Sequence, residues 1–119
     1  MTEKELRKLD AWIAEHVFEW TDIEFFQPPC DVMEEPNLPF WRGVQKACLL
    51  WQSVPCFTTD PAAAMMVLEK CFEKYYGIVI NFEPNSKTFV CWYGHPVVGT
   101  YAETLPLAIC LFAKKLFSK

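Results

Sequence analysis

Glycine is scarce in this chain, with four residues among 119, at positions 43, 77, 94 and 99. A phosphate-binding loop needs several glycines close together, so this spacing excludes a Gly-rich loop of that kind. Histidine is scarcer still, since His16 and His95 are the only two in the sequence. No two cysteines have the Cys-x-x-Cys spacing that is typical of zinc and redox sites. We therefore expect no cofactor and no enzymatic activity.

Positive charge and long apolar runs are also in short supply. Eleven Lys and Arg residues stand against fifteen Asp and Glu, which gives a net charge of −4, and no basic run occurs. A nucleic-acid footprint needs clustered basic residues, so this composition argues against one. The longest apolar segment, Leu105–Ala113, is far shorter than the ~20 residues that cross a bilayer. The first ten residues, MTEKELRKLD, lack the apolar core of a secretory signal. We expect a cytoplasmic protein that binds neither nucleic acid nor membrane.

What the chain has in abundance is material for a core. Hydrophobic residues make up 52% of it and aromatic residues 16%. A domain of this length buries roughly two-thirds of the surface that its unfolded chain exposes. We therefore expect a single domain over residues 1–119. Without a secretion signal, reduced thiols are favoured over a disulfide framework for the six cysteines, which are Cys30, Cys48, Cys56, Cys71, Cys91 and Cys110.

Two segments in the first two-thirds of the chain predict amphipathic helices. In residues 3–17, apolar side chains recur at helical spacing, and Thr2 with Glu5 forms the pattern of a capping box. The second helix begins after Thr59 or Asp60, either of which suits the N-cap, and Pro61 fits its first turn. We expect Gly77 to end it. Its predicted apolar stripe consists of Ala64, Val67, Leu68, Cys71, Phe72 and Tyr75.

The last helix, predicted over Leu105–Phe117, is apolar nearly all round. Thr104 is its expected cap, and Pro106 again lies in the first turn. A helix of this kind is either buried on two sides or presents an exposed patch that another surface covers. We expect it to mediate a homodimer. The phrase Thr-x-Pro-x-Ala opens both of these helices, and capping alone explains the repetition.

The remaining segments predict a small sheet. Residues 22–26 form a strand candidate, and residues 78–83, a turn at 84–87 and residues 88–93 form a hairpin. Residues 94–102 are a loop or a third strand, and the proline-rich segment 27–40 is a loop. Residues 47–53 fit a strand better than a short helix. The predicted class is α+β: a small antiparallel sheet, made of the hairpin 78–93 and one or two further strands, flanked by three helices in a layered α/β sandwich.

Four arrangements of reactive residues have an ordinary structural interpretation, which we favour. Cys91 and His95 have a Cys-x3-His spacing, but zinc would need a second pair drawn from Cys30, Cys48 or Cys56, so we expect no metal. Cys30 or Cys91 could pair with His16 or His95 as a nucleophile and base, yet nothing in the spacing enforces this. Glu34 and Glu35 lie in the proline-rich loop as solvated acids. Asp60 is better placed as a cap than as part of an anion site.

The aromatic residues are more suggestive. Large rings with a polar edge are favoured at interfaces, although any single tryptophan is more often part of a core. As a group they predict an interaction surface whose candidate residues are Trp41, Trp51, Trp92, Tyr93 and His95.

Three separated motifs resemble the phage ABA-sandwich domain family. They are DAWIAEHVF followed by Trp20, then TTDPAAAMMVLEK, then AETLPLAICLFAKK. The family's usual Ser-Thr-Asp before an alanine-rich turn reads Thr58, Thr59 and Asp60 here, with Phe57 in the aromatic place before it. Residues 27–52 depart from the family pattern and are treated as an insertion. The resemblance implies a compact layered α/β fold and a phage or prophage origin, and it supplies no catalytic residue.

Two functions follow as expectations. The first is a non-enzymatic phage or prophage accessory protein that binds a host or phage protein and forms a homodimer, in the cytoplasm of the bacterial host. The second is a small-molecule binder or enzyme for a nucleotide or metabolite. Its pocket would lie between the hairpin and the proline-rich insertion, with aromatic walls and His95.

Overall fold

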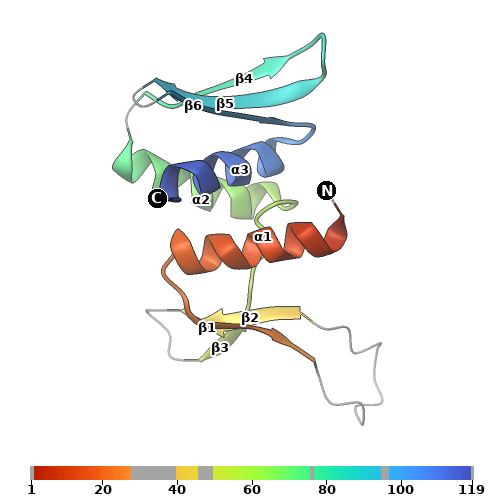
Figure 1. Cartoon of the computed structure of the whole chain (residues 1–119), viewed down its shortest axis with the longest axis vertical. Helices are drawn as coiled ribbons and strands as arrows, with labels where there is room; N and C mark the ends of the chain where they lie inside the picture. Colours follow the sequence, from red (N-terminus) through yellow and green to blue (C-terminus); the bar gives the residue numbers. More distant parts are fainter. Residues whose placement is uncertain (1, 28–39, 46–49, 76, 95–96, 119) are drawn as a thin grey trace. The chain divides into compact units, whose positions relative to one another are not determined.

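A computed structural model of the chain describes residues 2–27, 40–45, 50–75, 77–94 and 97–118. These residues form three α-helices and two antiparallel sheets of three strands each. The chain divides into two compact units, Met1–Pro55 and Cys56–Lys119, and each unit contains one of the sheets (Figure 1). The predicted α+β class with three helices is therefore confirmed, and the strands form two small antiparallel sheets where the sequence predicted one. The prediction of one domain, 1–119 with an insertion at about 27–52, stays a prediction.

The first unit begins with helix α1 (Glu3–His16). Thr2 is its N-cap, because the Thr2 hydroxyl accepts a hydrogen bond of 3.2 Å from the main-chain N–H of Glu5. This bond satisfies one of the N–H groups that have no partner within the first turn of a helix. The predicted apolar face is buried at Leu9, Ile13 and Val17. The helix and its cap are thus as predicted.

The first sheet consists of β1 (Thr21–Phe26), β2 (Phe40–Val44) and β3 (Trp51–Ser53), in that order. Helix α1 contacts β1 and β2 (Figure 1). The strand predicted at residues 22–26 is confirmed, and so is strand structure in the 47–53 segment at Trp51–Ser53. Strand β2 was not predicted, because Arg42 and Gly43 weaken its strand signal. Most of the predicted loop 27–40, and residues 46–49, lie outside the described residues.

A glycine is required at position 43, in the middle of β2. A Cβ atom built there would lie 2.5 Å from Ile23 Cδ1, 3.2 Å from the Thr21 carbonyl oxygen and 3.3 Å from the Trp20 ring. Trp20 is buried, so the site lies in the core of the first unit. This close approach explains why β2 contains a residue that strands ordinarily avoid.

The second unit begins with Phe57, which is buried, and helix α2 (Pro61–Lys74). Of the two predicted caps, Asp60 is the N-cap, and its carboxylate accepts a hydrogen bond of 3.1 Å from the N–H of Ala62. Thr59 precedes the cap. The predicted stripe is buried at four positions but Phe72 is 47% exposed, which corrects its assignment to the core. The helix ends at Lys74 with Tyr75 as an extended C-cap, so Gly77, at φ 78°, lies beyond the stop.

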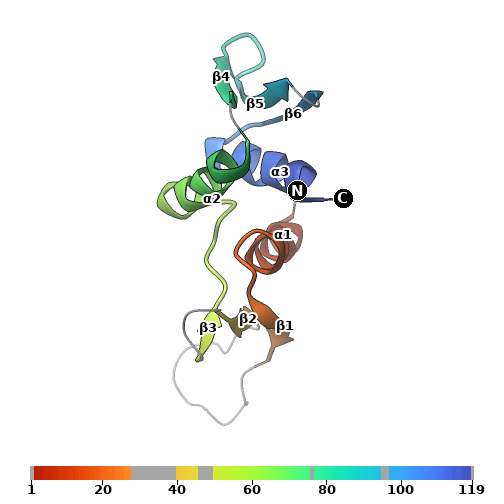
Figure 2. The ribbon, with the colours of Figure 1, turned by 90° about the vertical axis from the view of Figure 1, so that its left-hand side faces the viewer.

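The second sheet contains β4 (Val79–Glu83), β5 (Thr88–Gly94) and β6 (Val97–Ala102), in chain order. The predicted hairpin is confirmed, and the segment left open as a loop or a third strand is β6. Side chains alternate between the two faces of a sheet. Cys91, Thr100 and Ala102 are buried on the face that α3 contacts. Figure 2 shows this sheet with α2 and α3 on one side of it.

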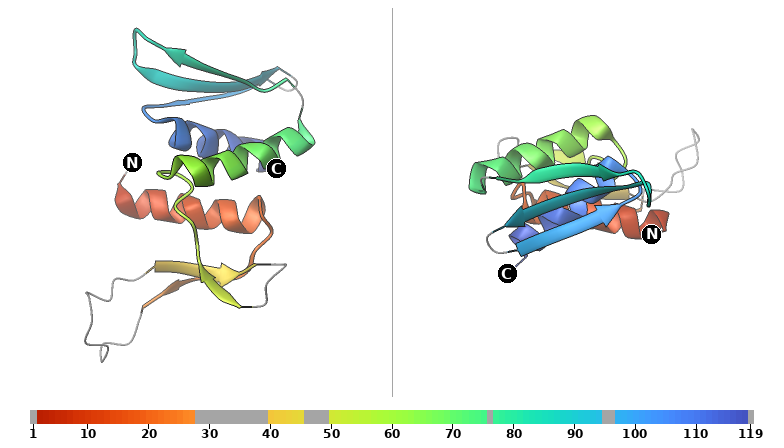
Figure 3. Two further views of the ribbon diagram at one scale, coloured as in Figure 1. Left: turned by 180° about the vertical axis from the view of Figure 1, so that it is seen from behind. Right: turned by 90° about the horizontal axis from the view of Figure 1, so that it is seen from above.

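Helix α3 (Leu105–Phe117) contacts α2 as well as strands β5 and β6. Of its residues, all of which the structure describes, only Lys114 and Lys115 are exposed. The helix is therefore buried on more than one side, which was the first of the two predicted alternatives. The view from above in Figure 3 (right) looks onto the three strands of this sheet, with α2 and α3 behind them.

Thr104 occupies the N-cap position of α3, but its hydroxyl makes no capping hydrogen bond. The position of the proline removes one of the two donors that a cap could use in α3 and leaves the N–H of the third helical residue, Leu107. An N-cap side chain bonds the N–H of the second or third helical residue. In α2 the proline is the first helical residue and leaves the N–H of Ala62 available, whereas in α3 Pro106 is the second and has no N–H. Within the described part of the chain, none of the helices has the length and hydrophobicity needed to span a membrane.

Candidate interaction surfaces

The predicted aromatic surface is distributed over both units. Trp41 and Trp51 belong to the first sheet, and Trp92 and Tyr93 belong to the second. His95 lies outside the described residues. Each pair is therefore described within its own unit, and the prediction that all five residues form one surface stays a prediction.

In the first sheet, Arg42 is stacked between two aromatic rings. Its guanidinium carbon lies 3.7 Å from the centre of the Phe26 ring and 4.2 Å from the centre of the Trp51 ring. Arg42 Nε also donates a hydrogen bond of 2.7 Å to Glu24 Oε1. The strand register places these four residues on one face of the sheet.

The positive charge of Arg42 is neutralised within this cluster by the carboxylate of Glu24. A cation over an aromatic ring contributes roughly 0.5–1 kcal/mol at an exposed site. The contacts of Arg42 therefore hold the Phe26 and Trp51 rings in place on the sheet. Trp51 is still 47% exposed, so it presents an ordered ring to solvent. Trp41 lies on the opposite face, half-buried, with its ring centre 5.3 Å from that of Phe25.

In the second sheet, Trp92 and Tyr101 share the face that points away from α3. Trp92 is paired with Gly99 and with Val79, and Val90 is paired with Tyr101. Trp92 is 42% exposed and Tyr101 is 73% exposed. We call the surface formed by Val79, Val90, Trp92 and Tyr101 the Trp92 face. Sequence reasoning missed Tyr101, since only the register of β6 shows that it lies beside Trp92.

Gly99 lies opposite Trp92 in the strand pair, and a Cβ atom built there would lie 3.6 Å from Trp92 Cβ, which is an ordinary contact. A Cβ atom built at Gly94 would lie 3.9 Å from Trp92 Cζ3, so the Trp92 ring extends along β5 towards Gly94. Tyr93 points to the other face, where its ring meets Tyr75 at 5.2 Å between centres in an edge-on arrangement. Tyr93 is therefore held by the helical layer, and Trp92 is the member of this pair that faces solvent.

Two of the described thiols, Cys71 and Cys91, are poor candidates for nucleophiles. Cys71 and Cys91 are fully buried. Burial raises the pKa of Cys71 to about 12, with a further contribution from Cys91, and burial raises the pKa of Cys91 to about 11. Both are therefore protonated at neutral pH, whereas the thiolate is the reactive form.

Of the histidines considered as a base or a metal ligand, the structure describes only His16. His16 stacks on Trp12 at 4.3 Å between ring centres, and its Nδ1 lies 3.1 Å from the Trp12 carbonyl oxygen. Cys30, Cys48, Glu34, Glu35 and His95 lie outside the described residues, and Cys56 is exposed. Among the residues that the structure describes, no three His, Cys, Asp or Glu side chains are grouped as metal ligands.

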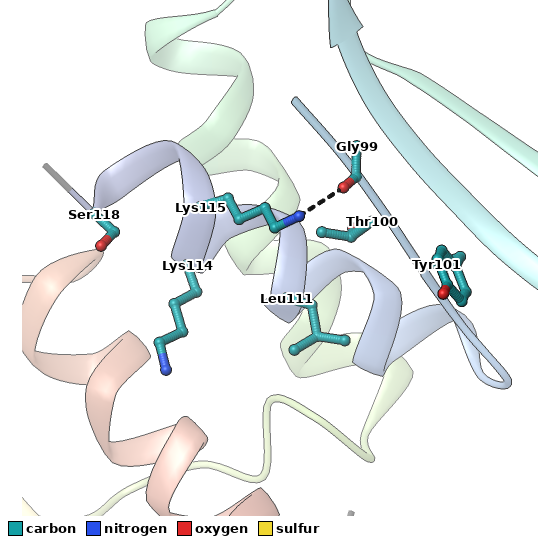
Figure 4. A pocket seen from close by; sticks show the side chains of 7 residues that line it. All are labelled: Gly99, Thr100, Tyr101, Leu111, Lys114, Lys115 and Ser118. Atoms are coloured by element: carbon teal, nitrogen blue, oxygen red, sulfur yellow. Dashed lines mark hydrogen bonds between the residues drawn. The ribbon is translucent and has the colours of Figure 1, made fainter. Parts of the chain in front are cut away.

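A groove lies between β6 and the C-terminal half of α3. Its volume is about 420 Å³, and we call it the β6 groove. Lys115 reaches across it, and its Nζ donates a hydrogen bond of 3.0 Å to the Gly99 carbonyl oxygen (Figure 4). The residues that line it are Gly99, Thr100, Tyr101, Leu111, Lys114, Lys115 and Ser118. The small-molecule pocket predicted between the hairpin and the proline-rich insertion falls on residues outside the described part.

The groove was not predicted from the sequence. In the sequence, the adjacent lysines at 114 and 115 indicate only the polar end of the last helix. Their position beside a strand edge depends on the register between α3 and β6, which no local pattern encodes.

Comparison with known proteins identifies the family of this chain and a solved structure with a similar fold. The model of the phage ABA sandwich domain matches residues 11–113. No curated protein matches the chain. A crystal structure of a phage protein from Bacillus cereus ATCC 14579 is similar, with a TM-score of 0.66 and 17% sequence identity, over 97% of this chain and 89% of that chain. At this identity the likeness shows the fold alone. Because the family model covers most of the chain, the protein belongs to the phage ABA sandwich domain family.

Proposed function

We propose that this protein is a small accessory protein of a phage or prophage that acts by binding another protein, of phage or host origin, in the cytoplasm of the bacterial cell. The observation that carries the proposal is the Trp92 face. Two large aromatic side chains project from the same face of an ordered sheet, and they are 42% and 73% exposed. Exposed, preorganised Trp and Tyr side chains are enriched among the residues that dominate binding at protein interfaces.

The composition supports a protein partner over a nucleic acid. The net charge of −4 opposes a phosphate backbone, whereas an aromatic surface stabilises contact with apolar side chains. A role without catalysis is also supported by the chemistry of the buried thiols, since Cys71 and Cys91 are protonated at neutral pH.

The test is affinity capture from a lysate of phage-infected cells, with wild type and the Trp92→Ala and Tyr101→Glu variants as bait. Phe82→Ala is the matched control, because Phe82 is a similarly exposed aromatic residue on the opposite face of the same sheet. We expect a protein that wild type and Phe82→Ala retain and that both variants of the Trp92 face lose. Equal capture by all four baits, with folding checked by circular dichroism, would refute the proposal.

The predicted homodimer is kept as part of the proposal, but α3 is a poor candidate for its interface. Only the two lysines of this helix are exposed, so it offers little apolar surface to a second copy. Exposed apolar side chains lie instead on the Trp92 face and on α2, at Met65, Met66 and Phe72. Light scattering across a range of concentrations tests self-association, and a monomer throughout would remove the dimer.

Binding of a small molecule is the second candidate function, and the β6 groove is the observation in its favour. Its volume of about 420 Å³ lies within the range of ligand pockets, and its lysines suit an anionic nucleotide or metabolite. A thermal-shift screen against such compounds tests it. A ligand at a hundredfold its dissociation constant stabilises a protein by about 2.7 kcal/mol, which raises the melting temperature clearly. The absence of any shift across the panel would exclude this function for the compounds tested.

A further inference from the structure

We propose that the β6 groove binds an extended acidic segment of a partner protein, which adds to the second sheet as a strand alongside β6. This inference rests on the proposed function and gives the partner a chemistry and a binding mode. It depends on three observations: the backbone of β6, the position of α3 beside it, and the charge of the groove.

Strand β6 is an edge strand. It pairs with β5, and among the described strands it has no second neighbour. In an antiparallel ladder, alternate residues direct their N–H and C=O groups to opposite sides of the strand. The Gly99 carbonyl accepts its hydrogen bond from Lys115, so the backbone of Gly99 points to the outer side. Tyr101 has the same parity, and an added strand would bond to these two residues.

The groove has the form that recognition of an extended peptide requires. A strand edge supplies main-chain hydrogen bonds, and an adjacent helix supplies contacts for alternate side chains of the peptide. Here Gly99 and Tyr101 represent the edge, and Leu111 of α3 also lines the groove (Figure 4). Lys115 reaches to the edge, whereas the Lys114 side chain points away from it. Leu111 is half-buried, so it offers an apolar contact at the base of the groove.

The charge of the groove selects an acidic occupant. Lys115 is exposed and its ammonium group bonds the neutral Gly99 carbonyl, and the described lining residues include no carboxylate. This is a local positive site on a chain whose net charge is −4. A main-chain N–H of the incoming strand would replace Lys115 at the Gly99 carbonyl. The released ammonium group would then pair with a carboxylate of the same segment.

Lys115 also has a simpler interpretation. A lysine at a strand edge discourages other strands from pairing with it, and the bond to Gly99 fits that protective role. The two interpretations differ in whether an extended acidic peptide binds to the groove. If Lys115 only guards the edge, no extended peptide binds, whatever its charge.

The test uses synthetic peptides of about eight residues, which span about 26 Å when extended. In every peptide, each second position is Val or Thr. The positions between them are all Glu in one set of peptides, all Gln in a second set and all Lys in a third set. Fluorescence anisotropy of labelled peptides measures binding to the full chain. We expect the Glu set to bind about tenfold more tightly than the Gln set and to weaken as salt is added, because exposed ion pairs are screened.

Two variants locate the site. In Lys114→Glu/Lys115→Glu the preference for the Glu set should reverse towards the Lys set, whereas Lys8→Glu, on α1, should leave it unchanged. Lys114→Gln/Lys115→Gln is a milder variant for use if the charge-reversed protein does not fold.

N-methylated peptides test the main-chain hydrogen bonds. N-methylation of alternate peptide residues removes their main-chain donors, so it should abolish binding when it falls on the residues that bond to β6 and have no effect when it falls on the residues between them.

Absence of peptide binding, equal binding of the Glu and Gln sets, or insensitivity to the lysine variants would each overturn the inference. The proposed function is judged separately. If capture from lysate still depends on Trp92 while no acidic peptide binds, the inference fails and the proposed function stands. If capture is also independent of Trp92 and Tyr101, both fail.

Discussion

The Tyr75 hydroxyl donates a hydrogen bond of 3.2 Å to the main-chain carbonyl of Leu116, which connects the end of α2 to the end of α3. Tyr75→Phe keeps the ring that packs against Tyr93 and removes only this bond. We expect the free energy of unfolding to fall by about 1 kcal/mol, because the carbonyl loses a partner at a partly buried site.

Tyr101→Phe is the matched control for that substitution. The Tyr101 side chain is 73% exposed, so the expected change is within about 0.5 kcal/mol. Urea denaturation measures both variants. An equal effect at the two positions would contradict a specific role for the bond to Leu116.

The two Thr-x-Pro-x-Ala phrases should differ when their caps are removed. Asp60→Ala deletes the acceptor for the Ala62 N–H and should destabilise the protein by about 1 kcal/mol. Thr104→Ala deletes a hydroxyl that makes no capping bond, and it should cost less than about 0.5 kcal/mol. Thermal or chemical unfolding gives both values, and similar losses would show that the two caps are equivalent.

A methyl group at position 43 should strain the first unit. Gly43→Ala places a Cβ atom 2.5 Å from Ile23 Cδ1 and should destabilise the protein by about 2 kcal/mol through overpacking. Ile23→Val removes the Cδ1 atom, so the double variant should recover part of the loss. Gly94→Ala is the control, since its nearest neighbour would be 3.9 Å away. A double variant that is no more stable than Gly43→Ala would indicate that Ile23 is not the obstacle.

The buried thiols should make stability fall in alkali. In the unfolded chain both thiols titrate near their ordinary pKa of 9.0, whereas burial raises the pKa of Cys71 to about 12 and that of Cys91 to about 11 in the folded protein. Above about pH 9 the unfolded state therefore binds fewer protons than the folded state, and the free energy of unfolding decreases as pH rises. Below that pH the contribution is constant.

Denaturation at about pH 8 and about pH 10.5 measures this decrease, which is at most about 1.4 kcal/mol per pH unit for each thiol. Cys71→Ala should make the decrease smaller, whereas Cys56→Ala, at an exposed position, should leave it unchanged. The same decrease in Cys71→Ala and wild type would assign the alkaline effect to other groups.

Local signals were sufficient for the helices and the hairpin. Caps, prolines in first turns and apolar periodicity act within a few residues, and Thr2, Asp60 and the turn at 84–87 perform the roles that the sequence predicted for them. Strand β2 was missed because its strand identity depends on tertiary packing. Gly43 is favoured there only because Ile23 and the Thr21 carbonyl approach it closely, which a linear pattern does not encode.

The candidate surfaces were predictable only in part. Trp51 and Trp92 were chosen for their residue type, and both are exposed. Trp41 and Tyr93 have the same composition signal, yet both are half-buried, and their rings meet those of Phe25 and Tyr75. Exposure of an aromatic residue depends on which face of a strand it occupies, and a one-residue difference in register exchanges the two faces.

Each sheet is a meander in which consecutive strands are neighbours, β1-β2-β3 and then β4-β5-β6. Pairing between segments that are close along the chain closes short loops and speeds folding. Domains commonly form while synthesis continues, from the N-terminal side onward. The strands up to Ser53 therefore have all of their partners before α2 leaves the ribosome, and the first sheet of this protein is able to assemble during translation.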